Sequence, residues 1–102
     1  MTETRIVRYT TTPESAEENA RLIRAVFAEL AERELTGVRY SAHRLDDGVS
    51  FVHVATTERG DASLTTLESF AAFQAGIADR CVDGPHVALA DVVGSFGVGA
   101  PH

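Results

Sequence analysis

The 102-residue sequence falls into two halves with the same order of elements: a strand, an amphipathic helix and a second strand. The turn Asp46-Asp47-Gly48 joins the halves. Asp-Gly between two alternating apolar runs favours a tight hairpin, because glycine tolerates the positive φ that such turns require. The strands at residues 38–45 and 49–57 are therefore predicted to pair. This plan uses nearly the whole chain, so residues 1–102 are predicted to form one domain that must itself carry any activity.

The first half begins with a predicted strand at residues 4–11, which is rich in β-branched side chains. Pro13 suits the first position of a helix, and Thr12 suits its N-cap. Apolar residues then recur every three or four positions as far as Leu30. This spacing predicts an amphipathic helix that ends near Glu34.

In the second half, Thr65 and Glu68 have the spacing of a capping box, which predicts that a helix begins near Thr65. Asp83-Gly84-Pro85 is a helix-stopping segment. The helix between them has an apolar stripe at Leu67, Phe70, Ile77 and Cys81, with Phe73 on its flank. Residues 86–96 are predicted to form the last strand, with a bend or bulge at Gly94.

Two βαβ halves joined by a hairpin predict a ferredoxin-like α+β fold with the order βαββαβ. In this fold a four-stranded antiparallel sheet carries two helices on one face. The remaining residues, 97–102, offer nothing to pack and are expected to form a flexible tail.

The sheet face without helices is expected to be covered too. Val52 and Val54 point to one face of their strand, and Phe51 and Ala55 point to the other, so both faces are apolar. The last strand has apolar residues on both faces as well. A bare face would expose an apolar patch of roughly several hundred Å², which monomers rarely tolerate. The pattern predicts a homodimer formed through the open sheet face.

Composition narrows the class of partner. The formal net charge of −6 argues against a nucleic-acid partner, which would need a basic face. No stretch approaches the ~20 apolar residues of a membrane-spanning helix.

Cys81 is the only cysteine, which excludes an internal disulfide and, without a signal-like N-terminus, favours the cytoplasm. The four histidines, His43, His53, His86 and His102, lack metal-ligand spacing, so a bound metal is not expected. All nine basic residues are arginine, which favours a GC-rich, bacterial genome.

The element order, the strand Phe51-Val52-His53-Val54-Ala55 and the helix Leu64-x-x-Leu67-x-x-Phe70-x-x-Phe73 resemble those of the dimeric α/β-barrel superfamily, near its antibiotic-biosynthesis monooxygenase-like group. The resemblance implies a barrel made of two sheets and a pocket between the helices and the sheet of each subunit. The catalytic residues of the group do not carry over. The first strand has Arg8 and Tyr9 in place of the group's asparagine, the chain has no tryptophan, and the stretch Ala78-Asp79-Arg80-Cys81 has no haem-ligating histidine.

His53 is the candidate catalytic residue, because a neutral imidazole in mid-strand can act as a general base near pH 7. The alternative is a core histidine satisfied by a hydrogen bond, or one that points into the dimer interface. The candidate substrate-binding residues are Tyr9, Tyr40, Arg8, Phe70 and Phe73. For the aromatic residues ordinary packing is the alternative, and for Arg8 it is an ion pair across the sheet.

The resemblance implies a cofactor-independent monooxygenase, or a related small-molecule enzyme, that acts on an aromatic or quinol metabolite. The alternative is a non-catalytic ligand-binding or stress-response barrel protein that acts through dimerisation. A third reading is a domain that associates with another protein. The residues alone leave open whether the protein is an enzyme.

Overall fold

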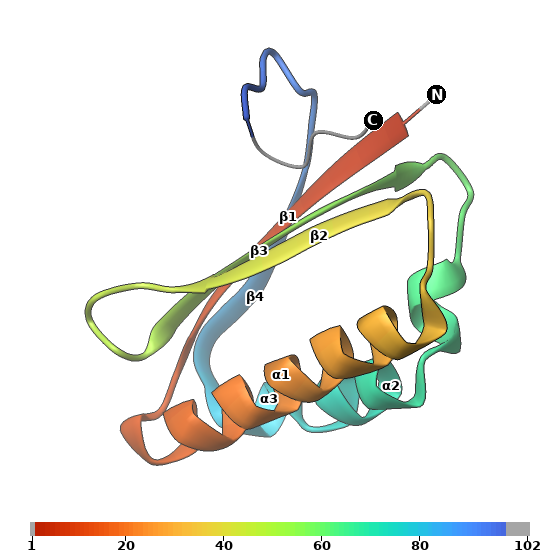
Figure 1. The fold of residues 1–102 in the computed structure, drawn as a ribbon. Coiled ribbons are helices and arrows are strands. Elements are labelled where there is room, and N and C mark those ends of the chain that lie inside the picture. Colours follow the sequence, from red (N-terminus) through yellow and green to blue (C-terminus); the bar gives the residue numbers. More distant parts are fainter. Residues whose placement is uncertain (1, 98–102) are drawn as a thin grey trace.

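The computed structural model describes residues 2–97 and has the predicted order of elements. The strands are β1 (Thr2–Thr11), β2 (Val38–Arg44), β3 (Ser50–Glu58) and β4 (Cys81–Ala90), and the helices are α1 (Ala16–Arg33), α2 (Glu68–Ala75) and α3 (Ile77–Arg80). The antiparallel sheet has the order β2-β3-β1-β4, and the helices cover one of its faces (Figure 1). The predicted ferredoxin-like α+β fold is confirmed. Apart from Gly97, the predicted tail at residues 97–102 lies outside the described residues.

The start and end of α1 follow the sequence signals. The Thr12 hydroxyl accepts a hydrogen bond from the backbone N–H of Ser15, and Pro13 opens the short 3-10 turn Pro13–Ser15 that leads into the helix. Glu34 ends α1 in the left-handed conformation, with a φ of 50°. The helix buries one stripe, made of Ala16, Asn19, Ala20, Ile23 and Val26, and one member of that stripe is polar.

The second helical segment differs from the prediction. The Thr65 hydroxyl donates to the carbonyl of Ala62 inside the 3-10 turn Ser63–Thr66, and α2 begins only at Glu68, so the predicted capping box is wrong. The helix also breaks at Gly76, which separates α2 from α3. Glycine favours such a break because it carries a high entropic cost inside a helix.

The last strand lies earlier than predicted. It covers Cys81–Ala90, so Asp83-Gly84-Pro85 lies inside β4 and does not follow a helix that includes Cys81. A proline is tolerated there because β4 is an edge strand, where not every N–H is needed for the ladder. The irregular pairing lies opposite Arg8–Thr10 of β1, whereas Gly94 falls beyond the strand.

The register of the sheet decides which side chains face the helices. Tyr9 pairs with Phe51, and Val7 pairs with His53, so these four side chains share one face. Tyr9 and Phe51 are each 1% exposed and stack on each other with ring centroids 5.5 Å apart. The core therefore lies between this face and the apolar stripe of α1, and His53 is on the same side.

The opposite face has no helix over it (Figure 1). Its centre is apolar, since Ile6 pairs with Val54 and Arg8 pairs with Val52. Val52 and Val54 are partly buried, and Arg8 is exposed.

The large apolar residues that are exposed lie almost all in one segment, from β4 to the chain that follows it: Val82, Val87, Leu89, Val92, Val93 and Phe96. Among residues 2–97, no helix has the length and apolar character needed to cross a membrane.

Candidate functional site

A cavity of about 590 Å³ lies between the helix-facing side of the sheet and the segment from Asp61 to Ile77. Tyr9, Tyr40 and His53 line it from three different strands, and Phe70 and Phe73 line it from α2. The remaining wall combines apolar residues, which are Val7, Ala55, Ala62, Leu64, Ile77, Pro85 and Val87, with polar ones, which are Glu3, Arg5, Thr57, Asp61, Thr65 and Gln74. Its volume lies within the range of roughly 300–1,000 Å³ that is typical of small-molecule pockets.

His53 lies between two tyrosines. Its Nε2 is 2.7 Å from the Tyr9 hydroxyl, and its Nδ1 is 2.7 Å from the Tyr40 hydroxyl. The side chain is buried, with a residue exposure of 4%. Both ring nitrogens are therefore occupied by protein hydroxyl groups, and a ligand in the cavity reaches the imidazole most directly through Tyr40.

Aromatic rings hold this arrangement in place. The ring of His53 lies 5.4 Å from that of Phe73, centroid to centroid. Tyr40 stacks on Phe27 of α1 at 4.9 Å, and Phe70 contacts Phe73 at 6.5 Å. Ring pairs at such distances add attraction beyond the burial of area. The orientation of the three polar rings is thus fixed by packing as well as by hydrogen bonds.

Two further polar residues extend the network behind Tyr9. Asn19 of α1 is completely buried, and its Nδ2 donates to the Tyr9 hydroxyl over 2.9 Å. Arg80 donates from Nε to Oδ1 of Asn19 over 2.9 Å, and from Nη2 to the carbonyl of Phe73 over 2.7 Å. A continuous chain of hydrogen bonds therefore joins Arg80, at the end of α3, to Tyr40 on the edge strand β2.

Arg80 is an unusual member of this network. Its exposure is 7%, and its guanidinium lies 5.2 Å from the centroid of the Phe73 ring. The ion pairs found within residues 2–97 do not include Arg80. Neutral oxygens and a ring face thus satisfy this buried charge, and its field acts on the adjacent polar chain.

Burial keeps the three rings of the network uncharged at neutral pH. It lowers the pKa of His53 from 6.5 to about 4 and raises the pKa of Tyr9 to about 12. It also raises the pKa of Tyr40, and the proximity of Tyr9 adds to that rise. Near pH 7 the site therefore contains a neutral imidazole between two neutral phenols.

The structure brings together most of the residues selected from the sequence. His53, Tyr9, Tyr40, Phe70 and Phe73 all line the cavity. Arg8 does not, because it lies one position from Tyr9 in β1 and so points to the open face, where it pairs with His86. Its expected place beside a substrate in this cavity is therefore not what the structure shows.

Asn19 and Arg80 were not predicted as site residues. Asn19 does carry a signal, since it is an amide at a position of the apolar stripe of α1, where a buried polar group needs a partner. Arg80 has no comparable signal, because a basic residue in the last turn of a helix is ordinary.

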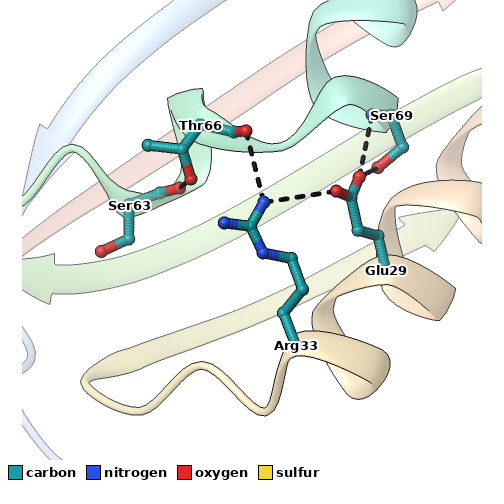
Figure 2. A network of polar contacts seen from close by, with 5 residues as sticks. All are labelled: Glu29, Arg33, Ser63, Thr66 and Ser69. Carbon is teal, nitrogen blue, oxygen red and sulfur yellow. Dashed lines mark hydrogen bonds and ion pairs between the residues drawn. The ribbon is translucent and has the colours of Figure 1, made fainter.

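The helix α2, which carries Phe70 and Phe73, is attached to α1 by hydrogen bonds at its first residues. The Glu29 carboxylate accepts hydrogen bonds from the backbone N–H of Ser69, at 2.9 Å, and from its hydroxyl, at 2.6 Å. Arg33 contacts both the Glu29 carboxylate and the carbonyl of Thr66, each at 3.4 Å (Figure 2). Since α2 has no cap from its own N-cap side chain, Glu29 supplies that cap from another helix.

Comparison with known proteins places this fold in a recognisable group. No protein-family model matches the sequence, and no curated protein matches it. Among solved structures, a Nitrosomonas europaea protein assigned as an antibiotic biosynthesis monooxygenase has a TM-score of 0.74 at 15% identity, covering 94% of each chain. PA3566 from Pseudomonas aeruginosa has a TM-score of 0.71 at 23% identity, covering 91% of this chain and 95% of that one.

SnoaB from Streptomyces nogalater, a cofactor-independent oxygenase, has a TM-score of 0.60 at 19% identity, covering 93% of this chain and 96% of that one. At these identities the likeness is one of fold. The chain has the fold of the antibiotic biosynthesis monooxygenase-like proteins over almost its whole length, as the resemblance implied.

Proposed function

We propose that this chain, which has the fold of the antibiotic biosynthesis monooxygenase-like proteins, binds an aromatic small molecule in its cavity and oxidises it without a tightly bound cofactor. The observation that carries the proposal is the buried His53, held between the hydroxyls of Tyr9 and Tyr40 in the wall of a mainly apolar cavity. An apolar cavity with a few convergent polar groups is the usual form of a small-molecule site.

The lining favours a flat, ring-containing ligand. Phe70 and Phe73 offer ring faces or edges on one side of the cavity, and Tyr40 offers a hydroxyl on another. In a cofactor-independent oxidation the substrate supplies the electrons. A ring methylene and O₂ give a ring carbonyl and one molecule of water, so that CH₂ + O₂ becomes C=O + H₂O. The tyrosine–histidine group would hold the ligand oxygen that gains charge during this step.

A second function, non-catalytic binding of the same class of ligand, has one specific observation in its favour. Both nitrogens of His53 are already hydrogen-bonded, so no free imidazole nitrogen faces the cavity. A base that removes a proton directly from a substrate needs such a nitrogen. Oxygen consumption distinguishes the two functions, because a binding protein would be stabilised by the ligand without consuming O₂.

We also propose that the protein acts as a homodimer. The support is the open sheet face, with Ile6, Val52 and Val54 at its centre and no helix over it. Light scattering is expected to give a mass twice the 10.9 kDa of the chain. Val54→Asp places a charge on this apolar surface and is expected to shift the protein to monomer while the circular dichroism spectrum stays unchanged. A wild-type monomer at micromolar concentration would refute the dimer.

The functional test is a thermal-shift screen with anthrone, anthraquinone and hydroquinones, followed by oxygen-electrode measurements on the compounds that stabilise the protein. Stabilisation and O₂ uptake are expected in the wild type, and both are expected to fall in His53→Gln. His43→Gln is the matched control, because His43 is exposed and, within residues 2–97, its side chain hydrogen-bonds only with Ser41. If no aromatic compound stabilises the wild type, the proposed function is wrong.

A further inference from the structure

The hydrogen bonds around His53 have a direction that the heavy-atom geometry fixes. We infer that the chain Arg80–Asn19–Tyr9–His53–Tyr40 donates in one sense only, so that Tyr40 presents an O–H to the cavity and the site selects ligands with a carbonyl-type acceptor oxygen. The inference rests on the proposed ligand-binding role of the cavity. It assigns to Tyr40 the contact with the ligand and to His53 a positioning role.

The direction is set first at Arg80. A guanidinium has donors and no acceptor, so the atom of Asn19 that lies 2.9 Å from Arg80 Nε must be the amide oxygen. The amide nitrogen of Asn19 then lies 2.9 Å from the hydroxyl of Tyr9 and can only donate to it. The orientation of the Asn19 amide is thereby fixed without reference to hydrogen positions.

The next step fixes the proton of Tyr9. Among the described residues its hydroxyl contacts two groups, Asn19 and His53, and Asn19 is a donor. The Tyr9 proton therefore has one acceptor available, Nε2 of His53 at 2.7 Å. If Nε2 carried a proton instead, the buried hydroxyl of Tyr9 would receive two donors and its own proton would have no partner, which buried polar groups avoid.

His53 transmits the direction to the cavity. A neutral imidazole has one N–H, and with Nε2 as acceptor that N–H is on Nδ1. Nδ1–H then donates to the Tyr40 oxygen at 2.7 Å. Within residues 2–97 the Tyr40 hydroxyl has no other hydrogen-bond partner, and Tyr40 lines the cavity. Its proton is thus the one that the chain leaves for a ligand.

The charge of Arg80 affects which ligand oxygens the Tyr40 hydroxyl prefers as acceptors. Each hydrogen bond in a chain polarises the next, and the cationic end makes every later O–H or N–H a better donor. Tyr40 should therefore favour an oxygen with negative partial charge, such as the carbonyl of a cyclic aromatic ketone or quinone. The apolar wall, with Val7, Ala55 and Phe70, suits the ring body of such a ligand.

The first test measures the tautomer of His53 and needs no ligand. Nitrogen-15 NMR of histidine-labelled protein at pH 7.5, assigned with His53→Gln, should show the Nδ1–H tautomer. A proton on Nε2 in the wild type would overturn the inference. The near-isosteric Asn19→Asp keeps an acceptor for Arg80 and replaces the donor to Tyr9 by a carboxylate oxygen. The Tyr9 proton should then turn to that carboxylate, and the tautomer should switch to Nε2–H.

The second test measures ligand choice with 9-fluorenone and fluorene, which share a ring system and differ in the carbonyl. Calorimetry should show at least tenfold tighter binding of fluorenone to the wild type, and Tyr40→Phe should remove this preference. The carbonyl infrared band of bound fluorenone should lie at lower frequency in the wild type than in Tyr40→Phe. Equal affinity for the two compounds, or identical bands, would overturn the assignment of Tyr40.

The two tests separate this inference from the proposed function. If neither compound binds, both the proposed ligand preference and the proposed function are wrong. The tautomer of His53 still shows in which direction the hydrogen bonds from Arg80 to Tyr40 donate. If Asn19→Asp does not fold, the wild-type tautomer and the Tyr40→Phe comparison remain decisive.

Discussion

The Nε–H of Arg80 donates to Oδ1 of Asn19 over 2.9 Å, although 61 positions separate the two residues in the sequence. The contact connects the end of α3 to the buried face of α1, behind the floor of the cavity. Because the charge of Arg80 is buried among neutral partners, the geometry of the whole polar chain depends on it. The stability and pH dependence of the protein should therefore report on the site.

The first prediction concerns His53 and pH. Burial lowers the pKa of folded His53 to about 4, below its ordinary value of 6.5, so the unfolded chain takes up a proton first as the pH falls. The stability contributed by the neutral imidazole is fully present above pH 6.5 and is lost progressively down to about pH 4. Between pH 7 and pH 5 the wild type should lose about 2 kcal/mol more stability than His53→Gln, measured by urea unfolding.

Acidic groups with lowered pKa values, such as Asp47 and Asp61, titrate in both proteins, so their effect cancels in this comparison. Parallel stability curves for the wild type and His53→Gln would contradict the prediction.

The two tyrosines beside His53 should differ in their effect on stability. Tyr9→Phe leaves the buried Nδ2 of Asn19 and Nε2 of His53 without a partner, and should lower the free energy of unfolding by about 2–4 kcal/mol. Tyr40→Phe leaves only Nδ1 of His53 unpaired, next to a cavity that water can enter, and should cost about 1 kcal/mol. Urea denaturation of both variants at pH 7 gives the comparison. Equal losses of unfolding free energy in the two variants would contradict the prediction that Tyr9 contributes more to stability than Tyr40.

The cap that Glu29 places on α2 can be removed separately from the site. Glu29→Ala deletes the acceptor for the N–H and hydroxyl of Ser69, so the unfolding midpoint in urea should fall. Glu32→Ala is the matched control, because Glu32 is an exposed carboxylate on the same helix. The same contact holds the pKa of Glu29 below its usual range, so this part of the stability should be present at neutral pH and be lost in acid. If the two variants unfold at the same urea concentration, the cap does not stabilise the fold.

Gly84 and Gly94 provide a further matched pair. Gly84 has a φ of 89°, and a Cβ built on it would lie 2.9 Å from the carbonyl oxygen of Arg8 and 3.1 Å from Cβ of Tyr9. Since both neighbours lie on or next to the backbone of β1, Gly84→Ala should destabilise the protein by about 2–4 kcal/mol. Gly94→Ala meets nothing within 4 Å and should change stability by less than about 0.5 kcal/mol. Thermal unfolding of both variants tests this difference.

The sequence was sufficient for the fold because its signals there are local. The Thr12 cap, the spacing along α1 and the Asp46-Asp47-Gly48 turn each depend on neighbouring residues, and each fixes one connection. The first and last residues of the second helix were harder to predict from the sequence. Thr65 and Glu68 have the right spacing for a cap, but the cap comes from Glu29, 40 positions before Ser69, and no local pattern records such a contact.

The site could be predicted in part for a similar reason. Alternation along β3 placed His53 on the same face as Phe51, and the sheet register then brought Tyr9 and Tyr40 to it. Which of the two faces the helices cover depends on packing, so the partners of His53 could only be seen in the structure. Arg80 lies in the site because its guanidinium donates to Asn19 and to the carbonyl of Phe73, and spacing does not reveal such tertiary contacts.

The attachment of α2 through Glu29 has a consequence for how this pocket can diversify. The contact uses the backbone and hydroxyl of Ser69 (Figure 2). The cavity is lined by the next residue, Phe70, and by Phe73. One short helix thus separates the atoms that fasten it from the side chains that meet a ligand. Descendants of this sequence can exchange Phe70 for side chains of other shapes, and so acquire new ligands, without loosening the wall that holds them.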